Sequence, residues 1–541
     1  MIHLSGITKH FGSKLLFKDG SFQINPGEKI GLVGQNGSGK TTLFRILTGS
    51  ESVEEGTVNK PDRLKIGYFS QNLEEMSGKT VLQEVKSASE RIGELQKEIS
   101  KIEAQLAEPM DEDQMMAVLE KYGELQAEFE ASGGYALEAQ AEEILTGLGF
   151  APEDQSRPVE SFSGGWKMRI ALAKILLINP DLLLMDEPTN HLDIESIMWL
   201  EGWLKNFKGS LLMTSHDREF MNKVVHQIVE VFAQGIHTYG GNYDFYLSER
   251  EIRSKQLIAS AKRQEEMLAK EKEFIARFAA RASHAAQVQS RVKKIDKIDI
   301  IEIPKEERAV QFQWQEVPRG GDEVLVVENL TKIWKTETGR EIPVFKEATA
   351  RVKRLDRVAV VGVNGAGKST FMKIAVGHTE PTSGTCRVGP SIEVGYFSQN
   401  SLDTLNPELT ILEELQSHIP TANLGVIRNL LGSLLFSGDD VDKKIKVLSG
   451  GEKSRVVLAK ILSKPINFLV LDEPTNHLDI SSREMLMEAL KSFEGTIMMV
   501  SHDRYFLRAL TNRVFTLDRN SLTTYDGTYD EFLDWRSRQN A

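Results

Sequence analysis

The sequence predicts an α/β protein with two phosphate-loop domains in tandem, a helical hairpin inserted in the first domain and a long helical linker between the two. Two observations predict the tandem: a glycine-rich phosphate loop occurs twice, and four further motifs follow each loop in the same order. A stretch without Gly or Pro between the copies predicts the linker. The paired motifs are GLVGQNGSGKTT and AVVGVNGAGKST, IGYFSQN and VGYFSQN, FSGG and LSGG, MDEPTNHLDI and LDEPTNHLDI, and TSHDREF and VSHDRYF.

The spacing of the motifs repeats as well. The interval from Lys40 to Gln71 equals that from Lys368 to Gln399, at 31 positions. From Gln71 to Ser163 the first copy spans 92 positions and the second copy 50, so the first copy carries an insertion of 42 residues. The expected boundaries are 1–242 for the first domain, with an inserted arm at about 88–131, 243–322 for the linker, and 323–541 for the second domain.

The composition limits the class of protein. The 541 residues are 40% hydrophobic and 27% charged, which is ordinary for a globular protein. Cys386 is the single cysteine, so we expect no intramolecular disulfide and a reducing, cytoplasmic location. No secretory signal pattern and no uncharged apolar run near ~18 residues are found, so no integral membrane segment is expected. The net charge of −12 argues against a general nucleic-acid binder.

Both glycine-rich loops have the context of a phosphate-binding loop. The apolar segments 30–33 and 358–361 predict the strands before the loops, and the residues after Lys40 and Lys368 predict helix starts. The glycines let backbone N–H groups face phosphate oxygens, and the lysines reach the β and γ phosphates. The loop residues expected to contact nucleotide are Gly34, Asn36, Gly37, Ser38, Gly39, Lys40, Thr41 and Thr42, and Gly362, Asn364, Gly365, Ala366, Gly367, Lys368, Ser369 and Thr370. Thr41 and Ser369 are expected to supply hydroxyls to Mg²⁺.

Two apolar strands each end in a pair of acids. The runs LLLM and FLVL lead into Asp186-Glu187 and Asp472-Glu473. Because a doubly wound sheet binds ligand at the carboxyl ends of its strands, we expect Asp186 and Asp472 to hold Mg²⁺. Glu187 and Glu473 are the expected general bases for the attacking water; turn carboxylates are the alternative.

One histidine follows each pair of acids. His216 and His502 lie 30 positions after Asp186 and Asp472, each at the end of an apolar segment and before Asp-Arg. At this interval a sensor of the γ phosphate is the favoured interpretation, with a structural histidine as the alternative.

Together these motifs resemble the ATP-binding cassette superfamily. FSGG and LSGG look like its signature motif, at Ser163, Gly164 and Gly165 and at Ser449, Gly450 and Gly451. Gln71 and Gln399 look like its Q-loop residues, which contact nucleotide and Mg²⁺. Phe11 and Trp334 stand where the family stacks adenine on an aromatic ring. The resemblance implies ATP and Mg²⁺ as ligands and hydrolysis of ATP to ADP and phosphate.

The family fold implies a head-to-tail pair in which the phosphate loop of one cassette faces the signature of the other. Site one then combines Lys40, Thr41, Gln71, Asp186, Glu187 and His216 with Ser449, Gly450 and Gly451. Site two combines Lys368, Ser369, Gln399, Asp472, Glu473 and His502 with Ser163, Gly164 and Gly165. The two signatures depart from the commonest final residue, with Trp166 in one and Glu452 in the other, which leaves the relative rates of the two sites open.

A narrower resemblance is to the ABC-F class. Asn190-His191 and Asn476-His477, the fused cassettes and the helical linker are similar to that class, and 279–298 is most similar to its YbiT-like bacterial branch. ABC-F proteins bind the ribosome near the exit and peptidyl tRNA sites and couple ATP to translation. The resemblance implies the ribosome and tRNA as partners here.

The linker reads as two helices that meet at a basic tip. Leu257, Ala261 and Leu268 recur at helical steps or their sums. Residues 274–298 carry six basic side chains and one acidic, a charge that suits an RNA backbone. The side chains expected to contact RNA are Arg277, Arg281, Arg291, Lys293 and Lys294. A plain spacer is the alternative.

The insertion reads as a second hairpin with the opposite charge. Residues 88–131 hold four Lys or Arg and twelve Asp or Glu, so RNA phosphate should repel this arm. We expect a basic ribosomal protein as its partner. Two other functions stay open from the sequence: the ATPase component of a membrane transporter and a DNA-maintenance ATPase. Two cassettes in one chain make a monomer sufficient.

Overall fold

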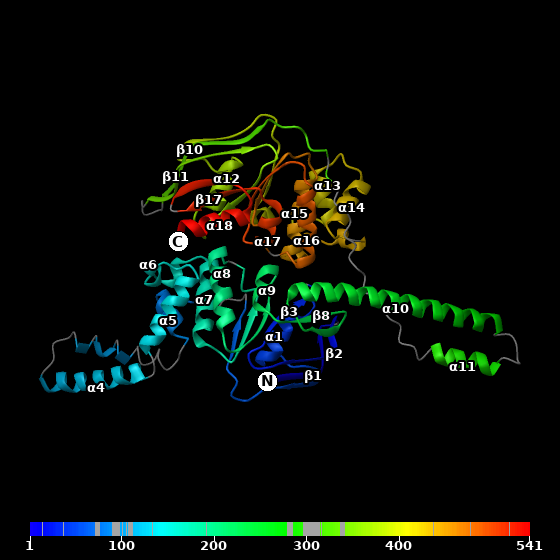
Figure 1. Cartoon of the computed structure of the whole chain (residues 1–541), viewed down its shortest axis with the longest axis horizontal. Helices are drawn as coiled ribbons and strands as arrows, with labels where there is room; N and C mark the ends of the chain where they lie inside the picture. The colour runs from blue at the N-terminus through cyan, green and yellow to red at the C-terminus, as the bar shows by residue number, and fades with distance from the viewer. Residues whose placement is uncertain are drawn as a thin grey trace.

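The computed structural model describes residues 1–540 apart from 13, 36, 71–75, 89–97, 100, 104, 107–111, 132–133, 191, 279–284, 296–313, 315, 336–340, 437, 477 and 519. Two α/β domains lie against each other, the first blue to teal and the second yellow to red in Figure 1. The predicted tandem of two α/β domains is confirmed.

A six-stranded sheet forms the centre of the first domain, in the order β5-β6-β7-β3-β8-β9. Its strands are β3 (Lys29–Gly34), β5 (Ile66–Phe69), β6 (Leu182–Asp186), β7 (Ser210–Thr214), β8 (Gln227–Phe232) and β9 (Gly235–Tyr239). All except β9 run parallel. β6 and β7 are buried along their whole length, as expected for apolar strands covered on both faces. Their register places Asp186 level with Thr214.

Two layers cover this sheet. Leu183 and Met185 belong to a cluster with the helices on one face, whereas Leu182 and Leu184 belong to a cluster with the small sheet on the other, because neighbouring strand residues point to opposite faces. The small antiparallel sheet consists of β1 (Ile2–Phe11), β2 (Lys14–Ile24) and β4 (Glu55–Asn59). α1 (Lys40–Thr48) packs in the cluster with the small sheet. The other helices are α2 (Val81–Lys86), α5 (Gly134–Gly147), α6 (Pro152–Gln155), η1 (Val159–Ser161), α7 (Gly164–Ile178), α8 (Ile194–Asn206) and α9 (Arg218–Val224).

The second domain repeats this plan. Its large sheet has the order β14-β15-β16-β12-β17-β18 and its small sheet the order β11-β10-β13. The strands are β10 (Glu323–Lys335), β11 (Glu341–Lys353), β12 (Arg357–Val361), β13 (Ser383–Val388), β14 (Val394–Phe397), β15 (Phe468–Asp472), β16 (Thr496–Val500), β17 (Arg513–Asp518) and β18 (Ser521–Asp526). The helices are α12 (Lys368–Ala375), η3 (Gln399–Thr404), α13 (Ile411–His418), α14 (Leu424–Ser433), η4 (Gly438–Asp442), η5 (Ile445–Val447), α15 (Gly450–Leu462), α16 (Ile480–Ser492), α17 (Arg504–Leu510) and α18 (Tyr529–Asn540).

The linker forms a helical hairpin that projects from the cassette pair (Figure 1). α10 (Tyr243–Phe278) begins against α9 and β8 of the first domain, and α11 (Ala285–Ile295) returns along it. The apolar stripe is only partly covered: Ala261 is buried, but Leu257 remains exposed because a two-helix hairpin offers little surface to pack against. No helix among the described residues is long and apolar enough to cross a membrane.

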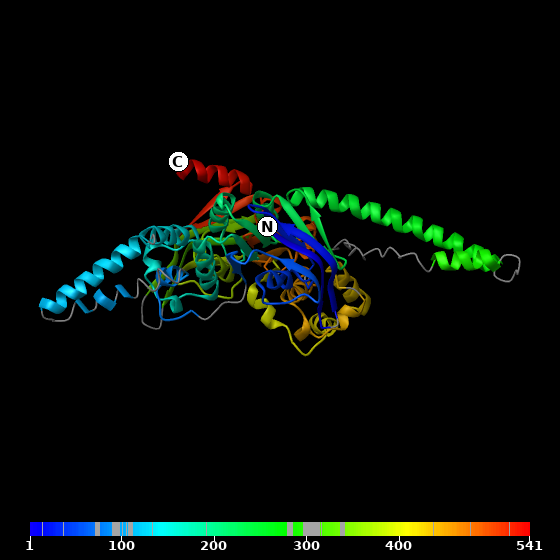
Figure 2. The same ribbon diagram turned by 90° about the horizontal axis from the view of Figure 1, so that it is seen from below.

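The arm projects on the side opposite the linker hairpin (Figure 2). Its returning helix is α4 (Glu112–Ala131), and Ile102, Leu125 and Phe129 form a small buried cluster. Met115, in the first turn of α4, is exposed.

Candidate active site

The phosphate loop of the first domain lies between β3 and α1. Gly37 and Gly39 have φ angles of 74° and 104°, a left-handed region that favours glycine and turns the chain directly into the helix. The Lys40 amine donates hydrogen bonds to the carbonyls of Gly34, at 2.7 Å, and Gln35, at 3.1 Å. The loop therefore wraps around the lysine at a helix N-terminus, an arrangement that binds phosphate.

The second loop has the same geometry. Gly365 and Gly367 have φ angles of 86° and 94°, and α12 begins at Lys368. The Lys368 amine donates to the carbonyls of Gly362, at 2.8 Å, and Val363, at 3.1 Å. Burial lowers the pKa of both loop lysines, Lys40 and Lys368, although the acids at the strand ends oppose that shift.

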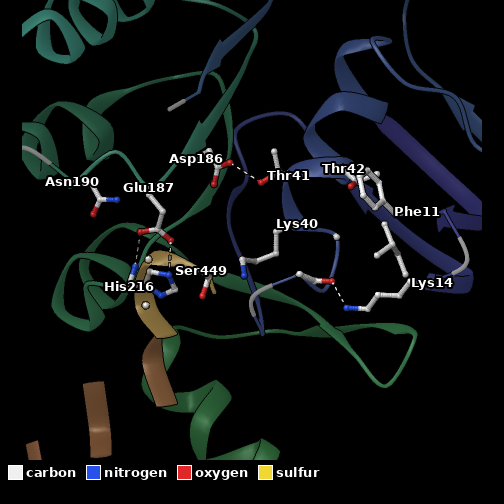
Figure 3. Close-up of a pocket in the computed structure, with 15 residues that line it drawn as sticks. Phe11, Lys14, Lys40, Thr41, Thr42, Asp186, Glu187, Asn190, His216 and Ser449 are labelled. Atoms are coloured by element: carbon white, nitrogen blue, oxygen red, sulfur yellow. Dashed lines mark hydrogen bonds and ion pairs between the residues drawn. The ribbon is translucent and has the colours of Figure 1, made fainter. Parts of the chain in front are cut away.

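A hydroxyl and a carboxylate lie side by side at the start of each loop helix. The Thr41 hydroxyl donates to Asp186 Oδ2 at 2.9 Å (Figure 3). The Thr214 hydroxyl donates to the other oxygen, Oδ1, at 2.7 Å. In the second domain the Ser369 side chain forms a hydrogen bond with Asp472. Asp472 Oδ1 is buried, with no hydrogen-bond partner among the described residues.

These oxygen atoms fit a Mg²⁺ ion. Hydroxyl and carboxylate oxygens are the ligands that Mg²⁺ prefers, and the ion usually takes its remaining ligands from phosphates and water. The described residues contain no group of three or more His, Cys, Asp or Glu placed to hold a metal.

The glutamate that follows each candidate Mg²⁺ ligand, Asp186 or Asp472, lies in a strained, buried turn. Glu187 and Glu473 both have a φ angle of 52°, which is unusual for a residue with a side chain. Burial raises the pKa of both carboxyls to about 7, although Arg483 from the second domain lowers that of Glu187 and Lys368 lowers that of Glu473. A pKa near 7 suits a general base.

A histidine contacts each of these acids. The His216 backbone N–H donates to Glu187 Oε2 at 3.0 Å, and its Nε2 lies 3.4 Å from Oε1. His502 and Glu473 repeat the contact, at 3.3 Å and 3.2 Å. Burial lowers the pKa of both histidines to about 3, so their rings are neutral at pH 7.

A cavity of about 550 Å³ joins the two domains at site one (Figure 3). It is lined from the first domain by Phe11, Lys14, Leu16, Gly37, Gly39, Lys40, Thr41, Thr42, Asp186, Glu187, Asn190 and His216, and from the second by Ser449, Gly450 and Gly451. The structure thus brings the first phosphate loop to the second signature. Ser449 is the N-cap of α15 and forms a capping box with Glu452, which fixes the signature serine.

Site two also faces residues of the opposite domain. The Asn364 backbone N–H donates to Asp193 Oδ2 across the interface at 3.3 Å. Asp193 also pairs with Arg169 of the signature helix α7 at 3.1 Å. Burial lowers the pKa of Lys368, an effect that Glu473 and Asp193 oppose and that Arg169 strengthens. α7 begins after its N-cap Ser163, so Gly164 and Gly165 form its first turn.

Sequence comparison identifies the family to which both domains belong. The ABC transporter family model matches residues 17–190 and 345–476, and a second ABC transporter model matches 229–312. ABC transporter F family member 5 of Arabidopsis thaliana is 36% identical over 538 residues, covering 98% of this chain and 77% of that protein. The chain belongs to the ABC-F class of the ATP-binding cassette family.

Bacterial relatives indicate which branch of the ABC-F class the chain resembles. The ATP-binding protein YbiT of Escherichia coli O157:H7 is 36% identical over 537 residues, covering 98% of this chain and 99% of that protein. YdiF of Bacillus subtilis (strain 168), also described as an ATP-binding protein, is 37% identical over 540 residues, covering 100% of this chain and 83% of that protein. The expected similarity to the YbiT-like branch of the ABC-F class is confirmed. As an ABC-F ATPase, the chain binds ATP and hydrolyses it to ADP and phosphate.

Solved structures share the tandem-cassette fold. RNase-L Inhibitor aligns with a TM-score of 0.59 at 17% identity, covering 99% of this chain and 93% of that one. The archaeal ribosome recycling factor aABCE1, solved with the ribosomal stalk protein aP1, aligns with a TM-score of 0.60 at 17% identity, covering 98% of this chain and 92% of that one. At this identity the match shows the fold.

Several predicted residues remain to be placed in the ABC-F sites. Asn36, Gln71 and Arg281 lie outside the described residues, as does the side chain of Gln399. The Ser38 hydroxyl is buried. Ala366 lies in the second phosphate loop, and Thr370 lies in α12. Trp334, the next-to-last residue of β10, is exposed, and the Lys332 amine lies 4.1 Å from its ring centre.

Sequence reasoning missed three groups of residues that the structure places at the sites. Lys14 lines site one and donates to the Gly37 carbonyl at 3.1 Å, but no repeated motif marks it. Asp193 lies in the duplicated motif NHLDI, and this duplication could have marked Asp193 as a site residue. Arg169 and Arg483 approach the sites from the opposite cassette, a relationship that appears only once the cassettes are docked.

Proposed function

We propose that this ABC-F ATPase is a cytoplasmic, monomeric translation factor that binds the ribosome near the exit and peptidyl tRNA sites. The observation that carries the proposal is the basic hairpin that projects from the cassette pair on α10 and α11. We divide the chain at 1–242, 243–322 and 323–541, so that the hairpin is a separate element between the cassettes.

The exposed cations of the hairpin support an RNA partner. Arg277 and Lys293 are exposed, and among the described residues Arg277 pairs only with Glu273 one turn away, at 3.0 Å. Arg291 and Lys294 both pair with Glu271, so they also hold α11 against α10 while parts of both side chains face solvent. A surface ion pair contributes little stability, so an RNA phosphate can replace the carboxylate at small cost.

The acidic arm supports a second contact, with a basic ribosomal protein. The hairpin and the arm lie at opposite ends of the molecule, and their charges are opposite (Figure 2). One molecule can therefore reach two surfaces of different charge at once. This arrangement favours a large, mixed RNA and protein partner over DNA alone.

The site residues supply the chemistry that drives binding and release. We assign Glu187 and Glu473 as general bases that take a proton from the attacking water, and the histidines beside them as sensors of the γ phosphate. Thr41 and Asp186, with Ser369 and Asp472, would hold Mg²⁺, which neutralises charge on the phosphates when bound. Lys40, Lys368 and the two signatures position the phosphates. Phe11 and Trp334 stack adenine.

The cassettes close on ATP because each nucleotide is held by both of them. Ser449, Gly450 and Gly451 reach the first phosphate loop only when the cassettes are together, so bound ATP favours the closed state. Hydrolysis removes the γ phosphate between the cassettes and lets them reopen. Closure moves the linker, which joins the two cassettes, and this coupling would control the ribosome complex.

Cosedimentation with bacterial ribosomes tests the role of the hairpin. The paired substitution Arg277→Glu and Lys293→Glu should weaken ATP-dependent binding by about tenfold or more and leave basal ATPase within about twofold, since only the phosphate contact is lost. Lys255→Glu is a matched control, because Lys255 lies on the same helix, is as exposed as Arg277 and pairs with Glu251 one turn away. Equal binding by all three proteins would contradict an RNA contact at the tip.

A further inference from the structure

Arg483 lies where the two cassettes are not alike. It occupies the first turn of α16, which starts after the N-cap Asp479. The equivalent residue of α8, counted from the matching N-cap Asp193, is Ile197. Isoleucine carries no hydrogen-bond donor in its side chain. The second cassette therefore presents a guanidinium at a place where the first presents only hydrocarbon.

The Arg483 side chain is fixed by three acceptors. Its Nη1 atom donates to the His216 carbonyl of the first cassette at 3.1 Å and to Asp503 Oδ2 at 3.1 Å. Its Nε atom donates to the Leu478 carbonyl at 3.1 Å. With 12% of the side chain exposed, these bonds are shielded from water and hold the guanidinium in one place.

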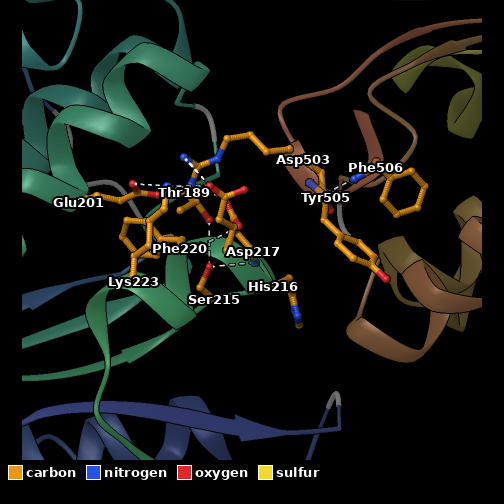
Figure 4. Close-up of polar contacts among 12 residues, drawn as sticks. Thr189, Glu201, Ser215, His216, Asp217, Phe220, Lys223, Asp503, Tyr505 and Phe506 are labelled. Atoms are coloured by element: carbon orange, nitrogen blue, oxygen red, sulfur yellow. Dashed lines mark hydrogen bonds and ion pairs between the residues drawn. The ribbon is translucent and has the colours of Figure 1, made fainter. Parts of the chain in front are cut away.

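The two acceptors at Nη1 belong to segments of opposite cassettes. We call residues 215–217 the first switch segment and 501–503 the second switch segment, because they carry His216 and His502. Asp503 is itself rigid, since its Oδ1 accepts the backbone N–H groups of Tyr505 and Phe506 at the start of α17. Figure 4 shows the first switch segment facing the segment that carries Asp503, Tyr505 and Phe506.

The contact at His216 reaches the catalytic acid of site one. The carbonyl held by Arg483 belongs to the residue whose N–H donates to Glu187 Oε2 at 3.0 Å. Fixing that carbonyl restricts rotation of the His216 backbone, and so orients both its N–H and its ring. A displacement of about 1 Å at such a position is enough to slow an enzyme strongly.

We propose that Arg483 is a positioning residue supplied by the second cassette to site one, where it fixes the His216 switch segment and makes the two ATP sites unequal. Site two has Ile197 at the matching place and lacks this restraint. The second end of Arg483, at Asp503, ties site one to the second switch segment. The inference rests on the proposed roles of Glu187 and His216.

The first round of ATP hydrolysis tests this directly. Chains loaded with two labelled ATP molecules are mixed with Mg²⁺, and phosphate release is followed in time. Arg483→Ile, which installs the residue of the matching position, should slow one of the two hydrolysis events by about tenfold and spare the other. Arg483→Lys, which retains one donor, should lose less. Loss of both events to the same degree, or of neither, would overturn the proposal.

Single-site variants then identify the slowed site. In a Glu473→Gln chain, only site one hydrolyses ATP at an appreciable rate. There Arg483→Ile should lower the first-round rate constant about tenfold, with little change in the ATP concentration for half-saturation. In a Glu187→Gln chain the same change should have less than a twofold effect, and the opposite pattern would also overturn the proposal. If the two Glu→Gln parents hydrolyse ATP normally, the assigned bases are wrong, while the two-event test still decides the role of Arg483.

A matched variant separates positioning from folding. Lys491→Ile removes a cation from the exposed end of the same helix, where Lys491 pairs only with Glu488 in the described structure. It should leave both hydrolysis events unchanged. The midpoint of thermal unfolding is measured for every variant. A positioning role predicts that Arg483→Ile slows one hydrolysis event while the protein is still folded.

Discussion

Arg504 of the second cassette and Glu201 of the first form an ion pair that is buried between the two cassettes. Arg504 also lies 3.4 Å from Glu219 and 3.8 Å from Asp217, so one cation meets three acids of the opposite domain. At the matching places of the other half of the interface, Met487 replaces Glu201 and Tyr505 replaces Glu219. There the Arg218 guanidinium lies 5.3 Å from the Tyr505 ring centre. The interface is therefore symmetric in fold and asymmetric in charge.

Closure should depend on this buried pair. Glu201→Met, which installs the residue of the matching position, leaves Arg504 buried without its nearest carboxylate and should cost the closed state about 3 kcal/mol. In a Glu187→Gln, Glu473→Gln chain, the ATP concentration that gives half-maximal compaction in small-angle X-ray scattering should rise by tenfold or more. Glu488→Gln, an exposed acid on α16, serves as the control. Identical titrations would show that Arg504 and Glu201 do not stabilise closure.

Removal of Mg²⁺ should stop hydrolysis at both sites. The Thr41–Asp186 and Ser369–Asp472 pairs offer hydroxyl and carboxylate oxygens that would hold Mg²⁺. Excess chelator should lower the steady-state rate by about 100-fold or more, and added Mg²⁺ should restore it. The measurement is phosphate release at saturating ATP. A rate that survives chelation would remove the metal from the assigned sites.

The motifs predicted most of each half-site. Phosphate loop, acid pair and histidine come from one cassette, and their places follow from strand ends and helix starts that local patterns reveal. The cavity at site one also contains the predicted signature residues of the other cassette. By contrast, Arg483 and the Arg504–Glu201 pair fall where the two copies differ. Their partners belong to the other cassette, so only the docked arrangement shows what they contact.

The first switch segment should communicate with the linker through Arg218. Arg218 follows His216 by two residues. Its guanidinium pairs with Asp244, in the first turn of α10, at 2.8 Å. Asp244→Asn should leave basal ATPase within about twofold but reduce its stimulation by ribosomes by about threefold or more, since the charge-assisted bond is weakened. The equivalent acid in α18 is Asp530, which pairs with Arg508. Asp530→Asn should retain the stimulation, and equal losses in both variants would argue against a specific path to the linker.

The acidic arm should contact protein rather than RNA. Glu120, Glu124 and Glu128 follow one another at four-residue steps along α4, so lysine substitutions there reverse the charge of one helix face. This triple variant should lose crosslinks from the arm to a ribosomal protein while crosslinks from the basic hairpin to RNA persist. Mass spectrometry of the crosslinked complex separates the two. Loss confined to RNA crosslinks would place the arm against RNA.

The most direct test of the account is ATP-dependent ribosome binding by the Glu187→Gln, Glu473→Gln chain. Without its two bases the protein should hydrolyse ATP about 10²–10⁴-fold more slowly and stay closed. The account predicts that this chain sediments with bacterial ribosomes when ATP is present and stays in the supernatant without it. If the chain binds ATP and still fails to sediment with ribosomes, the translation-factor function is contradicted.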